Sequence, residues 1–175
     1  MKNLVIGQSG GPTAVINASL YGAVKAFRES GADGHVLGMI NGIEGFLADH
    51  VMDLSTDLSD KELELLKLTP AAYLGSCRYK LPADLDSEVY PAIFDNFREM
   101  NIGYFLYVGG NDSMDTVDKL SRYAEKIGSD VKFIGIPKTI DNDLVLTDHT
   151  PGFGSAAKYV ASTVREIVLD ASVYQ

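Results

Sequence analysis

The fold class is most apparent in residues 104–113, which read Tyr104-Phe105-Leu106-Tyr107-Val108-Gly109-Gly110-Asn111-Asp112-Ser113. Its first half is a nearly continuous apolar run, which is typical of a strand in a parallel sheet covered on both faces. Two glycines end the run, and the amphipathic pattern from Ser113 to Ile127 predicts a helix. A buried strand that turns at once into a helix indicates an α/β protein.

The same alternation continues on both sides of this stretch. Repeated strand–helix units predict an α/β fold of the Rossmann-like kind, a doubly wound, mostly parallel sheet with helices on both faces. Pro91 must then lie in the first turn of its helix. The expected strands are residues 4–6, 36–40, 51–54, 104–108 and 131–136, and the expected helices are residues 12–30, 59–68, 87–100, 113–127 and 154–170.

Composition limits the class of partner and the compartment. The 175 residues carry a net charge of −9, which argues against nucleic acid or an anionic membrane as a main partner. The single cysteine, Cys77, permits no internal disulfide and favours a reducing cytoplasm. No signal peptide is visible, and no apolar run approaches the roughly 18–20 residues of a membrane helix.

Three expected strand ends carry unusual residues, and in open parallel sheets ligands bind beyond those ends. Gly10-Gly11-Pro12 follows the first strand, and its glycines would let a phosphate approach the backbone. The alternative is a plain tight turn. The segment is neither a P-loop nor a Gly-x-Gly-x-x-Gly fingerprint, because the residues those motifs require are absent.

The other two ends are richer in polar groups. Residues 109–113 offer oxygen ligands of the kind that Mg²⁺ prefers, although Asp112 and Ser113 could instead cap the next helix. Pro137-Lys138-Thr139-Ile140-Asp141-Asn142-Asp143 places one cation and two carboxylates after a strand, where a solvated loop is the alternative. Such groups could neutralise a transferring phosphoryl group and accept a proton.

These residues resemble the phosphofructokinase family, and within it the pyrophosphate-dependent branch. Ser9-Gly10-Gly11 with Asn17 is similar to the family's first phosphate-side turn. Residues 75–78 (Gly-Ser-Cys-Arg) resemble its Gly-Ser-x-Arg segment, and residues 109–113 resemble its Gly-Gly-Asp-x-Ser segment. Residues 137–143 match the Pro-Lys-Thr-Ile-Asp-Asn-Asp signature in full. The four segments occur in the family's order.

The resemblance implies a phosphofructokinase fold and a reversible glycolytic reaction. In that reaction Mg²⁺-bound pyrophosphate phosphorylates the 1-hydroxyl of fructose 6-phosphate to give fructose 1,6-bisphosphate. Asp141 would take the proton from that hydroxyl, with Lys138 and Asp112 also catalytic. The implied remaining roles are substrate binding by Thr139, Ile140 and Asp141, pyrophosphate binding by Gly11, Arg78 and Ser113, and Mg²⁺ binding by Asn111 and Asp143.

Two positions bear on the choice of donor. Family members that use ATP resemble one another in having glycine where this chain has Asp112 and, usually, where it has Lys138. A carboxylate at 112 would repel the α-phosphate of a nucleotide. Asn111 departs from the family's usual metal-binding aspartate, so an ATP-dependent 6-phosphofructokinase stays open as an alternative. A non-catalytic phosphate-binding module is the alternative from another class.

The resemblance also implies a division of the chain. Residues 1–150 would form the N-terminal α/β domain that binds the phosphoryl donor, and residues 151–175 would be the first helix of a truncated second, sugar-phosphate domain. Because family chains are more than twice as long, we expect this chain to be an incomplete fragment that is inactive alone. The full-length protein would be a homo-oligomer, a dimer or a tetramer.

Overall fold

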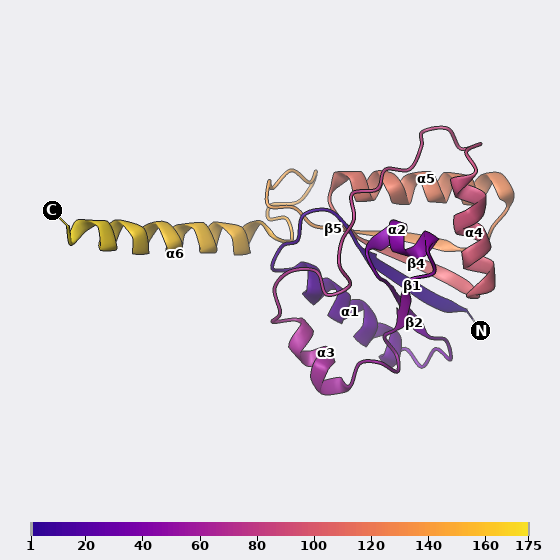
Figure 1. Ribbon diagram of the computed structural model, residues 1–175, viewed down its shortest axis with the longest axis horizontal. Helices are drawn as coiled ribbons and strands as arrows, with labels where there is room; N and C mark the ends of the chain where they lie inside the picture. Colours follow the sequence, from indigo (N-terminus) through magenta and orange to yellow (C-terminus); the bar gives the residue numbers. More distant parts are fainter. Residues whose placement is uncertain (1, 175) are drawn as a thin grey trace.

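The computed structural model describes residues 2–174 and has a five-stranded sheet in the order β3-β2-β1-β4-β5 (Figure 1). Every neighbouring pair is parallel except β2 and β3, which are antiparallel. The prediction of a mostly parallel α/β sheet is therefore confirmed. The strands are β1 (Asn3–Gln8), β2 (Val36–Met39), β3 (Val51–Asp53), β4 (Ile102–Gly109) and β5 (Lys132–Pro137).

Helices cover both faces of the sheet, as predicted (Figure 1). Successive side chains along each strand point to opposite faces of the sheet, so alternate residues belong to two separate cores. One core joins Ile6 and Val108 to the helices α1 and α3, and the other joins Val5 and Phe105 to α2, α4 and α5. These helices are α1 (Ile16–Glu29), α2 (Gly42–Leu47), α3 (Asp60–Leu66), α4 (Val89–Glu99) and α5 (Asn111–Ile127).

Among the helix starts that differ from the sequence prediction, those of α1 and α5 bear on the site. Helix α1 begins at Ile16 rather than at residue 12, because residues 12 and 13 are irregular and residues 14 and 15 form a turn first. The helix end therefore does not follow directly on the Gly10–Gly11 turn. Helix α5 begins at Asn111 with Gly110 as its N-cap and no side-chain capping bond. The alternative, that Asp112 caps this helix, is wrong, because Asp112 lies within the first turn.

Helix α2 was not predicted. Its six residues are too few to show a helical period, and it starts after Asn41, whose φ of 58° is left-handed. Pro91 lies in the first turn of α4, as required. Its helix begins at Val89, so the missing N–H of the proline falls where no intrahelical bond is made.

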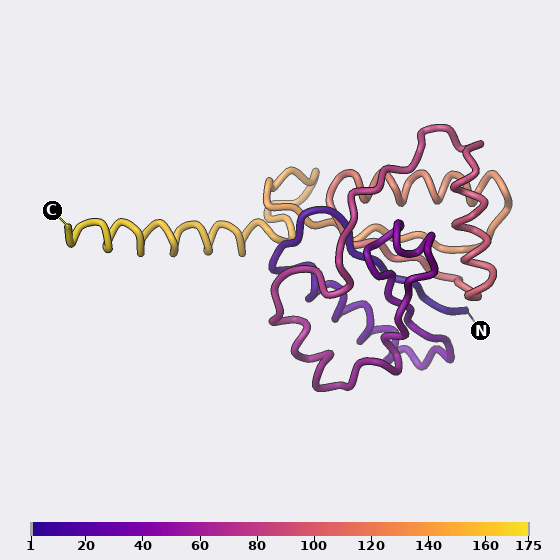
Figure 2. Tube along the Cα trace, viewed as in Figure 1, coloured from indigo at the N-terminus to yellow at the C-terminus, as the bar shows by residue number. Residues whose placement is uncertain are grey.

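The last helix, α6 (Phe153–Ser172), projects away from the sheet and from the helices that cover the sheet (Figures 1 and 2). It leaves apolar side chains in solvent along its length, among them Tyr159, Val164, Ile167 and Leu169. Within residues 2–174 no helix combines the length and apolar character needed to span a membrane. Met1 and Gln175 lie outside the described residues, and the assignment of 151–175 to a second domain stays a prediction.

The aromatic core under α4 gives a direct test of the packing. Phe97 is 2% exposed and contacts the rings of Phe46, Phe94, Phe105 and Phe133. We expect Phe97→Ala to lower the free energy of unfolding in urea by about 3–5 kcal/mol, because it leaves a cavity.

The matched control is Tyr159→Ala on α6, where the side chain is 71% exposed. It should change the free energy of unfolding by less than about 0.5 kcal/mol. Equal effects from the two substitutions would contradict the packing described here.

Candidate active site at the carboxyl edge of the sheet

The carboxyl ends of three neighbouring strands bring the polar segments together. Gln8 at the end of β1 pairs with Val108 of β4, and Gly109 pairs with Pro137 of β5. The pairing continues past the strands, because Ser9 N donates to Val108 O at 2.9 Å and Lys138 N donates to Gly109 O at 2.9 Å. The predicted constellation at one sheet edge is therefore confirmed.

Two adjoining hollows lie at this edge. The Arg78 hollow has a volume of about 310 Å³ and is lined by residues 9–11, 77–79, 110–113 and Lys138. The Asp141 hollow has a volume of about 260 Å³ and is lined by residues 11–13, 110–111 and 138–141. The two share Gly11, Gly110, Asn111 and Lys138, so a group bound in one hollow would meet a group bound in the other beside Lys138.

Lys138 is the buried charge of the site. The residue is only 6% exposed, and its Nζ donates to the carbonyl oxygen of Gly11. No carboxylate within residues 2–174 forms a salt bridge with it, and burial lowers its pKa below the ordinary value of a lysine. A buried ammonium without a counter-ion favours an anionic ligand. The solvated-loop alternative is wrong for this residue.

Asp112 lies across the Arg78 hollow and is paired with a lysine. Its Oδ1 is 3.2 Å from Nζ of Lys80, and both side chains are largely exposed. The carboxylate also stands in the first turn of α5, where the helix dipole favours negative charge. Sequence reasoning missed Lys80. A signal was present, because in an extended segment a residue two positions after Arg78 points to the same side.

The candidate metal ligands meet at the boundary between the two hollows. Asn111 Nδ2 donates to Asp143 Oδ2 at 3.2 Å, which joins the start of α5 to the loop after β5. That loop is held by its own side chains: Thr139 Oγ1 accepts from the backbone of Asp141 at 3.0 Å, and Asn142 Oδ1 accepts from that of Thr150 at 2.9 Å. The Asp141 and Asp143 carboxylates stay exposed at the site.

The remaining predicted residues also lie at the two hollows. Gly11, Arg78 and Ser113 line the Arg78 hollow, while Thr139 and Ile140 line the Asp141 hollow. All ten residues named from the sequence are thus brought to one edge, with Asp143 reaching it through Asn111.

Cys77 is a packed thiol at the back of the Arg78 hollow. It is 6% exposed, and its Sγ lies 3.6 Å from the hydroxyl of Tyr107. Burial raises the pKa of Tyr107, so that this phenol stays neutral beside Cys77.

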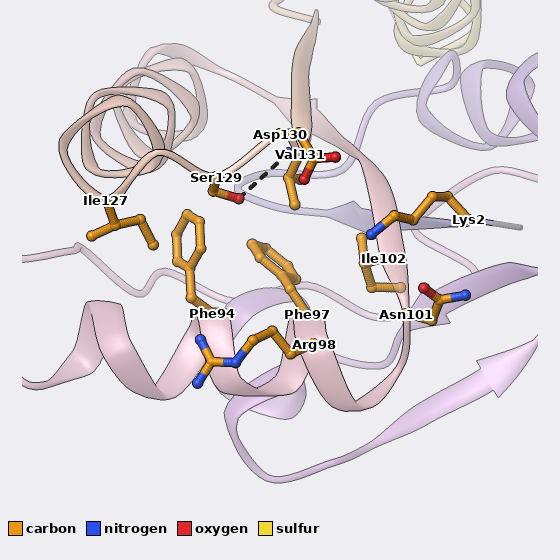
Figure 3. A pocket seen from close by; sticks show the side chains of 10 residues that line it. All are labelled: Lys2, Phe94, Phe97, Arg98, Asn101, Ile102, Ile127, Ser129, Asp130 and Val131. Atoms are coloured by element: carbon orange, nitrogen blue, oxygen red, sulfur yellow. Dashed lines mark hydrogen bonds between the residues drawn. The ribbon is translucent and has the colours of Figure 1, made fainter.

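A further hollow of about 350 Å³ opens at the opposite, amino-terminal edge of the sheet (Figure 3). Its floor holds the rings of Phe94 and Phe97, but these are only 3% and 2% exposed and offer a ligand little surface. The guanidinium of Arg98 at its rim is already paired with Asp95. The amino-terminal hollow therefore offers a ligand less than the carboxyl edge does.

The model of the family described as Phosphofructokinase matches residues 3–175. The chain belongs to the phosphofructokinase family. A pyrophosphate–fructose 6-phosphate 1-phosphotransferase of Halomonas elongata is 46% identical over 171 residues, which cover 96% of this chain and 40% of the relative. A sulfofructose kinase of Alkalicoccus urumqiensis is 39% identical over 167 residues, covering 95% of this chain and 42% of the relative.

Among solved structures, a pyrophosphate-dependent phosphofructokinase from Nitrosospira multiformis superposes with a TM-score of 0.89 at 43% identity. The alignment covers 97% of this chain and 42% of that one. The family and the fold implied by the sequence motifs are therefore confirmed. The chain spans about 40% of the length of the pyrophosphate-dependent relatives that it matches at 44–46% identity.

Two glycines at the site are expected to differ sharply in what they tolerate. A Cβ on Gly109 would lie 1.9 Å from Ser113 Oγ and 2.4 Å from Ser113 Cβ, whereas a Cβ on Gly11 meets nothing within 4 Å. We expect Gly109→Ala to lower the free energy of unfolding by about 1–3 kcal/mol or more through overpacking.

Gly11→Ala is the control, and it should change that free energy by less than about 0.5 kcal/mol. Urea unfolding followed by circular dichroism measures both. An unaffected Gly109→Ala protein would contradict the close packing of the β4–α5 turn.

Proposed function

We propose that this protein transfers a phosphoryl group from Mg²⁺-bound pyrophosphate to the 1-hydroxyl of fructose 6-phosphate, the glycolytic step that yields fructose 1,6-bisphosphate. The observation that carries the proposal is the position of Lys138, a buried cation on the boundary shared by the two hollows. Phosphoryl transfer needs a donor and an acceptor in line, with positive charge beside the group that moves.

The Arg78 hollow is proposed as the donor site. Arg78 and Lys138 supply positive charge for a pyrophosphate, and Gly11 leaves open space for its approach to the backbone. Asp112 lies in the wall of the same hollow and would repel the α-phosphate of a nucleotide. Four relatives at 44–46% identity bear the name of the pyrophosphate-dependent enzyme, which supports this donor over ATP.

The Asp141 hollow is proposed as the acceptor site. Asp141 accepts the proton of the sugar hydroxyl while that oxygen attacks the nearer phosphorus of pyrophosphate. The bond between this phosphorus and the bridging oxygen breaks, and inorganic phosphate leaves. Lys138 neutralises charge on the moving group, Ser113 lies at the donor side of it, and Thr139 fixes the loop through its bond with Asp141 N.

The residues at the boundary fit a donor that arrives with Mg²⁺. This ion takes one or two carboxylates, substrate phosphate oxygens and several waters rather than a dedicated protein cage. Asp143 and the amide oxygen of Asn111 can supply such a partial set, and residues 2–174 contain no cluster of three or more acidic, His or Cys ligands that would form a cage. When bound, the ion would neutralise the pyrophosphate oxygens and polarise the transferred group.

The proposal extends to the whole protein. Residues 1–150 are proposed as the donor-binding domain and residues 151–175 as the first helix of a second domain, which the unpacked apolar side chains of α6 support. A homo-oligomer in the cytoplasm is the proposed state of the full-length protein. The name of the sulfofructose kinase relative indicates a different acceptor, sulfofructose. Comparing fructose 6-phosphate with sulfofructose as acceptor in the full-length protein tests the proposed sugar.

The role of Asp141 as the general base can be measured separately from the binding of pyrophosphate. Asp141→Asn in the full-length protein should lower kcat by about 10²–10⁴, because the general base is lost, while pyrophosphate affinity stays within about twofold. Initial rates with fructose 6-phosphate and calorimetric titration with Mg²⁺–pyrophosphate measure the two quantities.

Asp148→Asn, in the same loop, is the matched control and should leave kcat within about twofold. If Asp141→Asn kept full activity, Asp141 could not be the base.

Donor choice is tested by changing both charged positions. The double variant Asp112→Gly with Lys138→Gly should lose at least about a hundredfold in kcat/KM for pyrophosphate and gain in kcat/KM for ATP, because one carboxylate no longer repels a nucleotide and one cation no longer holds the short donor.

Asp115→Gly controls for the effect of a new glycine, since Asp115 lies one turn further along α5 and forms an exposed i,i+4 pair with Lys119. It should lower both rates alike or leave both unchanged. An unaltered ratio of pyrophosphate to ATP use in the double variant would contradict the proposed role of Asp112 and Lys138 in donor choice.

A further inference from the structure

We propose that a buried pair of amides, Gln8 and Asn17, positions the donor arm, defined as residues 69–78, and thereby sets the place of Arg78 in the site. Both are positioning residues that act through this arm and do not touch the substrates. The inference rests on the proposed function, because it takes the Arg78 hollow as the donor site.

Gln8 is the last residue of β1 and is fully buried. Its Nε2 donates to Asn17 Oδ1 at 2.9 Å and to Ile16 O at 3.2 Å. Its Oε1 accepts from the backbone N–H of Leu74 at 2.9 Å. One side chain therefore joins the end of the central strand, the start of α1 and the donor arm.

Asn17 lies in the first turn of α1 and is 1% exposed. Its Nδ2 donates to Thr69 O at 2.9 Å, and its Oδ1 accepts from Tyr73 N at 2.8 Å as well as from Gln8. The two amides thus hold residues 69–74, the first part of the donor arm, at both ends.

The donor arm has no sheet ladder or helix of its own to fix its path. It lies in the long connection between α3 and α4, which contains only turns and irregular backbone. Buried backbone N–H and C=O groups must find partners, and here side-chain amides supply them. The amides therefore take the place that regular secondary structure has elsewhere in the fold.

The second part of the donor arm is joined to the Gly10–Gly11 turn. Ser76 Oγ donates to Gly10 O at 2.6 Å, and Cys77 O accepts from Gly10 N at 3.2 Å and from Ser9 Oγ at 3.3 Å. Arg78 follows directly. A displacement at Leu74 would consequently reach the arginine within four residues.

The chemistry explains why amides stand at both positions. Each must donate to a carbonyl and accept from an N–H at the same time, and an amide does this without charge and with a longer reach than the hydroxyl of Ser or Thr. A carboxylate at position 8 would face the Ile16 carbonyl oxygen, and an apolar side chain would leave Leu74 N–H buried without its acceptor.

The test removes the amides and follows donor affinity. Gln8→Met and Asn17→Leu keep the approximate side-chain size but cannot form these bonds. Titrating the 175-residue chain with Mg²⁺–pyrophosphate in a calorimeter should show about tenfold weaker binding for each variant. Because both act through one arm, the double variant should be weaker by about twentyfold or less, far short of the hundredfold of independent sites.

The variant Ile93→Ala is the control for a general loss of stability. It truncates a fully buried side chain of α4, on the face of the sheet opposite to α1. It should destabilise the fold by a comparable amount without changing pyrophosphate affinity. Amide hydrogen exchange at residues 74–78 should quicken in Gln8→Met at low denaturant but not in Ile93→Ala. In the full-length protein, the KM for pyrophosphate should rise while the KM for the sugar stays constant.

The outcomes separate the two proposals. Wild-type chain that does not bind Mg²⁺–pyrophosphate would overturn the proposed donor site, and the positioning role with it. Wild-type binding together with unchanged affinity in Gln8→Met would overturn the positioning role alone. If Gln8→Met does not fold, Ser76→Ala removes only the hydroxyl bond to Gly10 and should weaken binding about threefold; unchanged affinity there would also overturn the role.

Discussion

The parallel pairing of β1, β4 and β5 is the constraint on which the site depends. The register sets Gln8 beside Val108 and Gly109 beside Pro137, so three chain segments leave the sheet at the same edge. None of these segments has enough contacts of its own to form a site. A slip of one residue in either pairing would also turn every side chain of the moved strand to the wrong core. The packing of the two cores and the geometry of the site therefore rest on the same register.

Among the charged groups at this edge, Lys138 is the buried one. The chain carries a net charge of −9, yet its carboxyl edge holds a buried ammonium that donates to the backbone carbonyl of Gly11. Burial disfavours the charged form and lowers the pKa of Lys138, so binding an anion beside it relieves an unfavourable state. Asp112 is held differently, in solvent and beside Lys80. The proposed donor site thus combines a cation that attracts phosphate with a carboxylate that limits what else can enter.

Much of this arrangement could be predicted from the sequence, because strands and their ends follow from apolar runs and glycines. The run from Tyr104 to Val108, for example, identified β4 and located the turn after it. What could not be predicted depends on tertiary contacts. Helix α2 has too few residues to show a period, and α1 starts late because the turn before it is not helical. The contacts of Gln8 with Leu74, 66 positions away, arise from the path of an irregular segment that no local pattern encodes.

Donor and acceptor are proposed to meet beside Lys138, with the donor in the Arg78 hollow. A crystal structure of the chain grown with Mg²⁺ and pyrophosphate would test this arrangement. We expect difference density for pyrophosphate between Arg78 and Lys138, with one phosphate next to Gly11 and the metal beside Asn111 and Asp143. Pyrophosphate bound only at the amino-terminal edge, or soaked ATP with its adenosine seated beside Asp112, would contradict it.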